Sequence, residues 1–120
     1  MIVLSYTKMG DNSIVLHTIS QKWGRRGFLV KVGKNTAMSR FLPLNIIEGE
    51  VTESPKSTLW RASKFTSRYP LNGIRSNLYK NSMTLFMSEV LYRVIKDGSD
   101  EPGLYDAIAK DILTLDAMDS

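Results

Sequence analysis

Cysteine is absent from the 120-residue sequence, and histidine occurs once. The missing thiols exclude a disulfide framework and a thiolate zinc site within this stretch of chain, and they fit a reducing cytosol. No apolar run approaches the roughly 20 residues that a membrane-spanning helix needs. The first residues also lack the basic and apolar pattern of a signal peptide. We therefore expect a soluble, cytoplasmic protein with no membrane partner.

Side chains that could carry catalysis or hold a metal are also scarce. His17 is alone in a predicted strand, where a single histidine is more often a packing or surface residue than a base. No serine, histidine and aspartate set, no metal-spaced cluster and no glycine-rich phosphate loop occurs. Glu48 and Glu50 share a strand face and could bind Mg²⁺ weakly, but a solvated strand face is the commoner meaning of this pattern. We expect no enzyme, no cofactor, no metal and no small-molecule substrate.

Acidic residues are missing from long stretches of the first two-thirds. Residues 1–80 hold 13 Lys or Arg against 4 Asp or Glu, a net charge of +9, whereas residues 81–120 hold 3 against 8, a net charge of −5. No acid occurs between Asp11 and Glu48, or between Glu53 and Glu89. Soluble surfaces usually mix both signs, because like charges repel. The cationic first part therefore indicates a polyanionic partner such as nucleic acid.

Basic residues of the first acid-free stretch are the candidates for phosphate contacts. Single-stranded nucleic acid is held by cations along the phosphates and by aromatic rings that stack on bases. Trp23, beside Gly24 in a predicted turn, is the best candidate ring, since Phe28 is expected in the core and Trp60 fits either place. The predicted DNA-binding residues are Lys22, Trp23, Arg25, Arg26, Lys31, Lys34 and Arg40.

Segments rich in β-branched and aromatic residues, divided by turn residues, predict five strands before residue 70. Alternation places Phe28 and Val30 on one face of the third strand and Lys31 on the other. Gly49 inside the fourth predicts a bulge or bend. The predicted strands cover residues 2–6, 13–20, 26–32, 42–51 and 58–66. This pattern is typical of a small, closed or nearly closed barrel, and we expect one over residues 1–70.

After residue 70 the apolar spacing becomes that of a helix. One helix is predicted over residues 74–96, ending at Asp97-Gly98, and a second after a cap at Ser99 or Asp100, with Pro102 in its first turn. The first is apolar around much of its circumference, so a small barrel cannot cover it all. We therefore expect residues 71–120 to begin a larger helical domain that is truncated here.

The apolar residues that recur at helical spacing form a stripe on each of these two helices. In the first helix they are Ile74, Leu78, Leu85, Val90 and Val94, with Met83, Phe86, Leu91 and Ile95 widening the stripe. In the second they are Leu104, Ile108, Ile112 and Leu115. Met83, Met87 and Met118 are interpreted as core filler, since methionine adapts to irregular gaps.

Several segments, in their order and spacing, resemble the RecO family of bacterial recombination mediators. Residues 2–4 with 8–13 are similar to the family's opening hairpin, and Trp23-Gly24 with residues 28–31 to its next turn and strand. Residues 42–48 resemble its proline-containing strand, and residues 84–92 and 103–116 resemble the first two helices of its central domain. The resemblance covers nearly the whole chain but only the amino-terminal half of a usual member, and the first long helix resembles that of Bacteroides-type members.

The resemblance implies an all-β OB-fold barrel of five strands followed by two α-helices, α+β overall. It implies binding of single- and double-stranded DNA, annealing of complementary strands, and help in loading RecA onto strands coated by single-strand-binding protein. RecR and that coating protein are the implied partners, in the cytoplasm at the nucleoid. Family members carry DNA-binding residues on the third strand and the loop after it, where Lys31 and Lys34 stand.

Two other functions fit the same residues. An RNA-binding OB barrel would use the same basic residues, and the sequence does not separate the two polymers. A protein-interaction module would instead work through the broad helix predicted over residues 74–96, with the basic barrel incidental.

Overall fold

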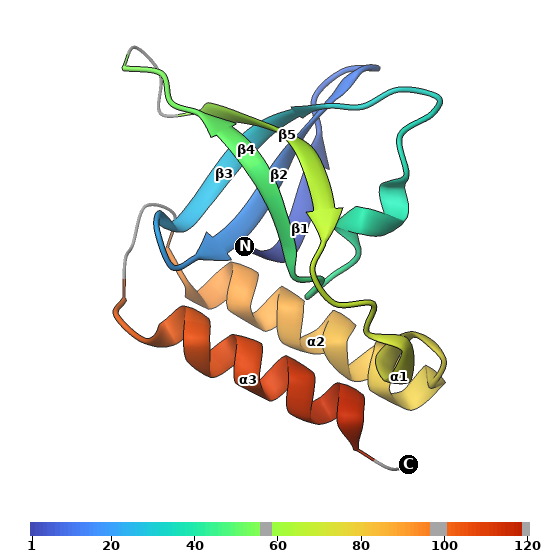
Figure 1. Cartoon of the computed structure of the whole chain (residues 1–120). Coiled ribbons are helices and arrows are strands. Elements are labelled where there is room, and N and C mark those ends of the chain that lie inside the picture. Colours follow the sequence, from blue (N-terminus) through green and yellow to red (C-terminus); the bar gives the residue numbers. More distant parts are fainter. Residues whose placement is uncertain (56–58, 97–100, 119–120) are drawn as a thin grey trace.

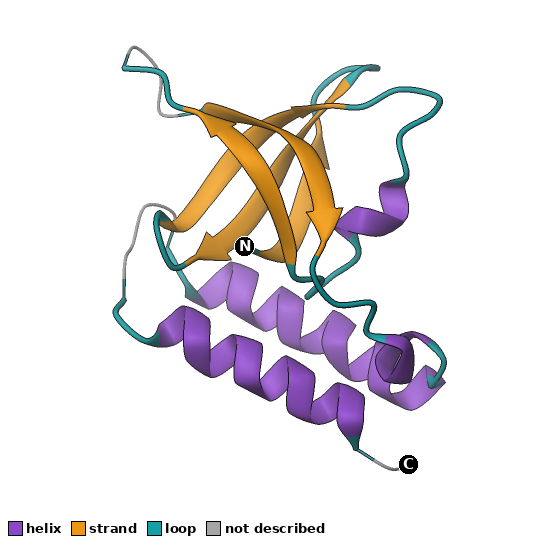
Figure 2. Ribbon diagram, viewed as in Figure 1, coloured by secondary structure: helices purple, strands orange, loops and turns teal. Residues whose placement is uncertain are grey.

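The computed structural model describes residues 1–55, 59–96 and 101–118. A five-stranded mixed sheet comes first and helices follow it, so the arrangement is α+β (Figures 1 and 2). The strands are β1 (Ile2–Lys8), β2 (Ser13–Ser20), β3 (Gly24–Lys31), β4 (Ile47–Thr52) and β5 (Trp60–Ser67). A 3-10 helix, η1 (Met38–Phe41), lies between β3 and β4, and the α-helices are α1 (Asn72–Arg75), α2 (Leu78–Val94) and α3 (Leu104–Ala117). None of these described helices is long and apolar enough to cross a membrane.

The sheet has the strand order β1-β2-β3-β5-β4, and it curls until its two edges meet. Neighbouring strands are antiparallel except β3 and β5, which run parallel with Phe28 opposite Trp60. At the meeting edges the Val3 N–H donates to the Asn45 carbonyl at 2.9 Å, and the Leu44 N–H donates to the Val3 carbonyl at 2.7 Å. This pairing satisfies backbone groups that an open edge would expose. We call the curled sheet the barrel.

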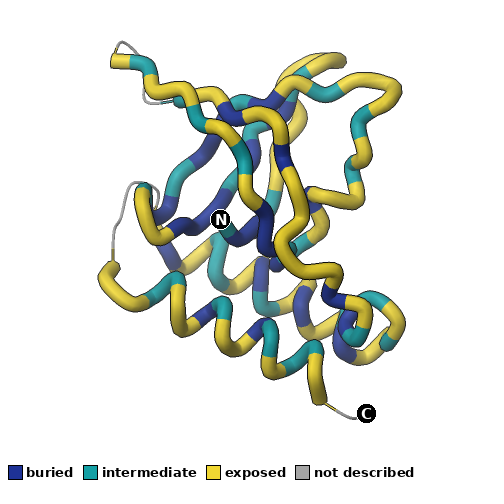
Figure 3. Tube along the Cα trace, viewed as in Figure 1, coloured by how far each residue is buried: buried dark blue, intermediate teal, exposed yellow. Residues whose placement is uncertain are grey.

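Two apolar clusters form the core. One fills the barrel and includes Phe28, Val30, Phe41 and Phe65. The other lies where the barrel meets the helices, and Figure 3 shows buried residues gathered there. Its members from the strands and the segment before β4 are Ile2, Leu4, Ile19, Leu44 and Ile46, and those from the helical part are Leu71, Ile74, Ile95, Ile108 and Ile112. Strands and helices therefore share the second of these two clusters.

Specific polar contacts hold α1 against its neighbours. The Arg75 guanidinium donates to the Pro43 carbonyl at 2.9 Å and to the Asn81 side-chain oxygen at 2.8 Å. Burial lowers the pKa of Arg75, and the Asp116 carboxylate acts in the opposite direction. Gly73 lies so close to the end of α3 that an added Cβ would stand 2.0 Å from the Asp116 carbonyl oxygen. The chain therefore needs glycine at this crossing.

The strand predictions are confirmed in number and differ at their ends. The bulge predicted at Gly49 is confirmed, because the β4–β5 register shifts between Glu48 and Glu50. The fourth strand begins at Ile47 rather than at residue 42, since Leu44 has a φ of 64° and the Asn45 N–H closes a turn on the Leu42 carbonyl. The third strand is Gly24–Lys31 instead of residues 26–32. The fifth is Trp60–Ser67, and residue 58 of its predicted span lies outside the described residues.

The helix predictions require changes inside the first helix and at the helix ends. The helix expected over residues 74–96 is divided into α1 and α2, because the Asn77 side chain accepts a hydrogen bond from the Lys80 N–H and caps a new start. α2 ends at Val94, and the predicted stop at residues 97–98 lies outside the described residues, as do residues 99–100 of the predicted cap. Pro102 precedes α3 instead of lying in its first turn.

Only part of the apolar stripe predicted for the first helix is buried, in line with the expectation that a small barrel cannot cover it all, whereas the face predicted for α3 packs into the core. Ile108 and Ile112 of α3 are buried, with Leu104 and Leu115 packed beside them. In α2, however, the buried face consists of Lys80, Thr84 and Ser88. The exposed apolar residues of α2 are Leu78, Tyr79, Met83, Leu85, Phe86, Val90 and Val94. Met87 packs at the core as predicted, but Met83 and Met118 are exposed.

Candidate nucleic-acid interface

A hollow of about 530 Å³ opens between β3, η1 and β5. β3 and β5 pair only around Phe28 and Leu29, and the loop after β3 and the 3-10 helix border the gap beyond that pairing. Four cationic side chains line it: Lys31 from β3, Arg40 from η1, and Arg61 and Lys64 from β5. We call this site the basic groove. It borders the loop after β3, at the end of the barrel that points away from the helices (Figure 1).

The floor of the basic groove is apolar and fixed. Phe41 and Phe65 meet edge to face with their ring centroids 5.3 Å apart, and both rings are buried. The Arg40 guanidinium donates to the Phe65 carbonyl at 3.0 Å, which holds the 3-10 helix against β5. The cations therefore stand on a rigid base, so less entropy is lost when they bind a ligand.

The backbone shape of the rim has two local causes. The Gly33 N–H donates to the Thr36 hydroxyl at 2.8 Å, and the Thr36 N–H donates to the Gly33 carbonyl at 3.1 Å. These two hydrogen bonds close a turn after β3. Opposite, the β4–β5 bulge gives Lys64 a φ of 56°, in the left-handed region that a lysine seldom adopts. This conformation places Lys64 among the residues that line the groove.

The electrostatics of the basic groove favour an anion. Its other lining residues are apolar or uncharged, so no Asp or Glu among the described residues lines it. Glu50 forms an ion pair with Lys64 at 3.4 Å, but both side chains are largely exposed, so water screens the contact. Several cations converge there without a buried acid to neutralise them.

The predicted binding residues that the structure brings to this groove are on and after the third strand. Lys31 is exposed at the end of β3 and lines the groove, on the face opposite buried Phe28 and Val30, as the alternation predicted. Arg40 lines it from η1. Lys34 is exposed in the turn at its rim, directly before the lining residue Asn35.

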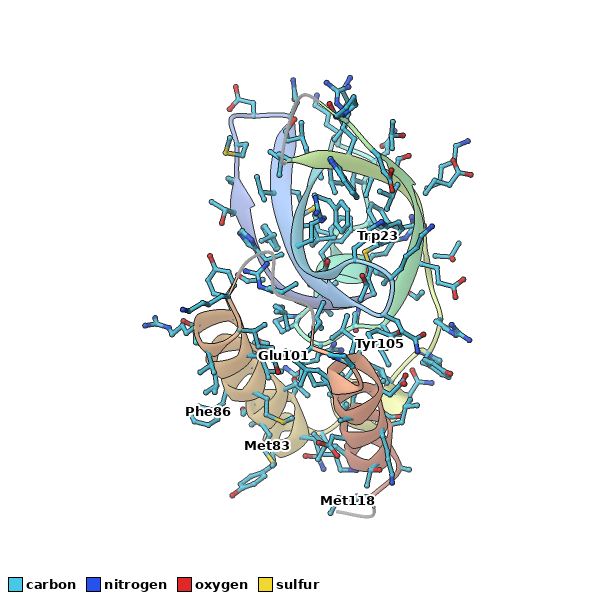
Figure 4. The ribbon with its side chains drawn as sticks, turned by 90° about the vertical axis from the view of Figure 1, so that its left-hand side faces the viewer. Trp23, Met83, Phe86, Glu101, Tyr105 and Met118 are labelled. Carbon is cyan, nitrogen blue, oxygen red and sulfur yellow. The ribbon has the colours of Figure 1, made fainter. Side chains whose placement is uncertain are left out.

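Lys22 and Trp23 lie at the opposite end of β3. The Trp23 ring meets the Phe28 ring edge to face at 5.9 Å, and the Lys22 ammonium lies 4.9 Å from the centre of the Trp23 ring. Figure 4 shows Trp23 within the barrel outline. The proposed stacking of Trp23 on a base stays a prediction, and in this conformation the ring is partly buried against the barrel core.

Arg25 and Arg26 are each placed beside an aromatic ring. Arg25 is only 3% exposed, and its guanidinium lies 5.2 Å from the ring centre of Tyr92 in α2. Arg26 lies 3.8 Å from the ring centre of Trp60, whose Nε1 donates to the Ser54 carbonyl at 3.2 Å. Both arginines therefore lie outside the basic groove, and Arg25 joins the barrel to α2.

Sequence reasoning left out two cations of this groove, Arg61 and Lys64. They belong to the second acid-free stretch, whose charge was recognised but not assigned to a site. The parallel pairing of β3 with β5 carries them beside Lys31, and this pairing joins segments far apart in the chain. The lack of acidic residues in this stretch indicates that its cations belong to a binding site. Only the strand order shows that Arg61 and Lys64 lie in the same groove as Lys31.

Fold and site together define a class: a small β-barrel protein with a cation-lined groove, joined to a helical hairpin. No protein-family model matches the chain. It is 30% identical to the DNA repair protein RecO of Phocaeicola vulgatus over 122 residues, which cover 98% of the chain and 51% of that relative. The DNA repair protein RecO of Bacteroides fragilis is 31% identical over 119 residues, covering 96% of the chain and 49% of that relative.

A third relative, the DNA repair protein RecO of Porphyromonas gingivalis, is 32% identical over 127 residues, covering 98% of the chain and 51% of the relative. The chain is therefore similar over nearly its whole length to the amino-terminal part of RecO-family proteins. It spans about half the length of the curated relatives it matches. The family resemblance drawn from the residues is confirmed.

Proposed function

We propose that the basic groove binds the phosphate backbone of DNA, and that the chain acts in DNA repair and recombination like its RecO relatives. The observation that carries the proposal is the convergence of Lys31, Arg40, Arg61 and Lys64 on one groove without an acid in its lining. Cations held beside a polyanion release its condensed counterions, and this release supplies most of the sequence-independent affinity for DNA.

We assign the barrel to the OB fold. Support comes from five strands in the order β1-β2-β3-β5-β4, from the β1 pairing that closes the edges, and from the parallel β3–β5 contact. OB folds bind oligonucleotides partly through the loop between strands four and five. A second hollow shares Arg61, Leu29 and Thr52 with the basic groove and reaches that loop at Ser54 and Pro55. A DNA strand could thus run along β5 from the basic groove to the second hollow.

The character of the groove favours contacts to phosphates over contacts to bases. The rings in its lining, Phe41 and Phe65, are buried and offer no face for stacking. Recognition through phosphates carries little sequence information and does not require unpaired bases. The site is thus suited to single- and double-stranded DNA alike. Neutralised backbones repel each other less, and this would assist annealing of complementary strands.

The wider activities that the family resemblance implies belong to the same proposal. They are loading of RecA onto strands coated by single-strand-binding protein, and contacts with RecR and with that coating protein, in the cytoplasm at the nucleoid. The described residues do not point to where these proteins dock. The proposal for this chain is that it supplies the DNA contact on which such steps depend.

The test is fluorescence anisotropy of a labelled single-stranded oligonucleotide, titrated with the chain at several salt concentrations. Affinity should fall steeply with salt. A Lys31→Gln, Arg61→Gln double variant should weaken binding for every sequence and lower the salt slope by roughly 1.4, about 0.7 for each lost phosphate contact. Lys110→Gln, which removes an exposed charge on α3, is the matched control and should change neither value.

An unchanged slope in the double variant would remove the groove from the binding site. Lys34→Gln, added to this pair, tests the neighbouring turn and should lower the slope by a further similar step. Competition with an RNA of the same sequence separates DNA from RNA binding. Tighter binding of the RNA would replace this proposal with the RNA-binding one.

A further inference from the structure

The 3-10 helix η1 carries one of the four cations of the basic groove, but it has little to hold it in place by itself. It spans only Met38–Phe41, and it follows Ala37, whose side chain cannot cap it. A 3-10 helix of this length is weakly stabilised by its own hydrogen bonds. Figure 2 shows it beside the strands of the barrel. Contacts with the rest of the chain must therefore fix the position of Arg40.

Two side-chain contacts hold η1 against β5. The Phe41 ring meets the Phe65 ring edge to face, and the Arg40 guanidinium donates to the Phe65 carbonyl at 3.0 Å. The second contact uses the same guanidinium that meets the ligand in the proposed function, so an anion in the groove competes with the Phe65 carbonyl for its N–H groups. A hold on the main chain of η1 that does not depend on the ligand has to come from elsewhere.

The side chain of Asn45 supplies that hold. Its Nδ2 donates to the Ser39 carbonyl at 3.0 Å and to the Arg40 carbonyl at 3.2 Å, and both carbonyls belong to the last turn of η1, where helical partners run out. The backbone of Asn45 is itself fixed, because its N–H donates to the Leu42 carbonyl at 3.1 Å and its carbonyl accepts from the Val3 N–H of β1 at 2.9 Å. Asn45 therefore caps η1 from the closed edge of the barrel.

Arg75 of α1 fixes the orientation of that amide. Its guanidinium donates to the Asn45 Oδ1 at 2.5 Å, to the Pro43 carbonyl at 2.9 Å and to the Asn81 Oδ1 of α2 at 2.8 Å. Because a guanidinium only donates and a backbone carbonyl only accepts, the Asn45 amide has one orientation that serves both of its neighbours. The partly buried guanidinium needs these acceptors in turn, since an unpaired charge is costly to bury. The helical part of the chain is thus joined to η1 through one amide.

We propose that Asn45 and Arg75 are positioning residues for DNA binding, which hold Arg40 at the wall of the basic groove without touching the ligand. Neither of the two lines the groove. A cation on a fixed main chain binds a phosphate with a smaller loss of entropy than one on a mobile loop. The helical part thereby contributes to DNA affinity from outside the binding site. This inference rests on the proposed function, because it assigns how one cation of the groove is held.

A double-mutant cycle on DNA affinity tests the proposal. The variants are Asn45→Ala, Arg40→Gln and the two combined, and each is titrated into the labelled single-stranded oligonucleotide while anisotropy is followed. Arg40→Gln should lower the salt slope by about 0.7, the value for one lost phosphate contact. Asn45→Ala should weaken binding about two- to tenfold, the range expected when a side chain and its loop must be ordered on binding. In the Arg40→Gln background the same substitution should change the affinity by less than about 1.5-fold, because the two residues act as one unit.

Arg75→Lys is the second variant, because it keeps the positive charge but replaces the planar fork of N–H groups with a single ammonium. It should weaken DNA binding in the same way, and again only while Arg40 is present. Arg93→Lys is the matched control: Arg93 is exposed on α2 and paired with Glu89 at 2.6 Å, so this change should leave the affinity as it is. Circular dichroism at the temperature of the titration shows which variants are folded. If Asn45→Ala is unfolded, the cycle of Arg75→Lys with Arg40→Gln decides the outcome.

Unchanged affinity in the folded variants of Asn45 and Arg75 would show that both residues serve stability alone, and it would overturn the proposal. An equal loss with and without Arg40 would also overturn it, since the two residues would then act by another route. If Arg40→Gln leaves the affinity unchanged while the Lys31→Gln, Arg61→Gln variant lowers it, this inference fails and the basic groove remains the binding site. If neither variant lowers the affinity, the proposed function itself fails.

Discussion

Gly49 occupies a point of β4 where another side chain has no room. A Cβ there would stand 2.7 Å from the Phe65 ring and 3.0 Å from the Ser63 carbonyl oxygen. The bulge at this residue lets the ring of Phe65 pack across the strand, under the basic groove. The glycine therefore links the bend of the sheet to the floor of the site.

Gly49→Ala should lower the free energy of unfolding by about 1–3 kcal/mol, because the ring and the neighbouring strand must shift to admit the methyl group. Urea unfolding followed by circular dichroism measures the change. Gly33→Ala is the control: nothing lies within 4 Å of its added Cβ, so its effect should stay within about 0.5 kcal/mol. Equal effects of the two variants would show that the close contact at Phe65 is unimportant.

The turn between β2 and β3 shows how an element decides what a residue can do. Trp23 lies in this turn, and its backbone N–H donates to the Ser20 hydroxyl at 3.0 Å. Its ring is directed onto Phe28 and is flanked by Lys22. An exposed tryptophan would suit base stacking, but the turn brings this ring back onto the barrel.

The chain has two tryptophans, so Trp60→Phe leaves Trp23 as the sole indole reporter. Adding a single-stranded oligonucleotide to this variant should quench its fluorescence only slightly, because the partly buried Trp23 ring packs against Phe28 and the Lys22 ammonium lies over it. The reciprocal Trp23→Phe variant reports on Trp60 by the same titration. Strong, saturable quenching in the Trp60→Phe variant would establish the stacking role proposed for Trp23.

The same scale explains what the sequence could predict. Alternation and turn residues determine the five strands, the bulge at Gly49 and the outward direction of Lys31, since each depends on near neighbours. The buried face of α2 could not be predicted from residue patterns of this kind, because its buried residues are polar. Thr84 and Ser88 are buried because α2 packs close to β1 and their hydroxyls bond within the helix. Apolar periodicity instead marks the outward face of α2, which is exposed in this chain. Arg61 was missed because the β3–β5 pairing is long-range.

At the scale of the whole molecule, the barrel and the helices depend on each other. Ile2, Leu4 and Ile19 of the strands are 3% exposed or less, and they share a cluster with residues of α1 and α3. The domain boundary predicted at residue 70 stays a prediction. The shared cluster implies that the two parts unfold together.

A fragment of residues 1–70 should therefore be largely unfolded. Uncovering Ile2, Leu4 and Ile19 costs about 1.5–3 kcal/mol for each side chain, which is comparable to the whole stability of a small domain. Circular dichroism and the dispersion of amide proton shifts measure the outcome. A fragment with the unfolding midpoint of the full chain would contradict this interpretation and support two independent domains.

Closure of the barrel has a kinetic consequence. The β2–β3 hairpin pairs strands that are neighbours in the sequence. The edges of the barrel, in contrast, close through the contact between Val3 and Asn45, and β3 pairs with β5 through Phe28 and Trp60, so both pairings are long-range. Closing a long loop costs conformational entropy before the contact that it forms can stabilise the fold. Chains with many such long-range contacts therefore fold slowly. We therefore expect the basic groove to be among the last features to form as the chain folds, since both of its walls depend on the long-range pairing of β3 with β5.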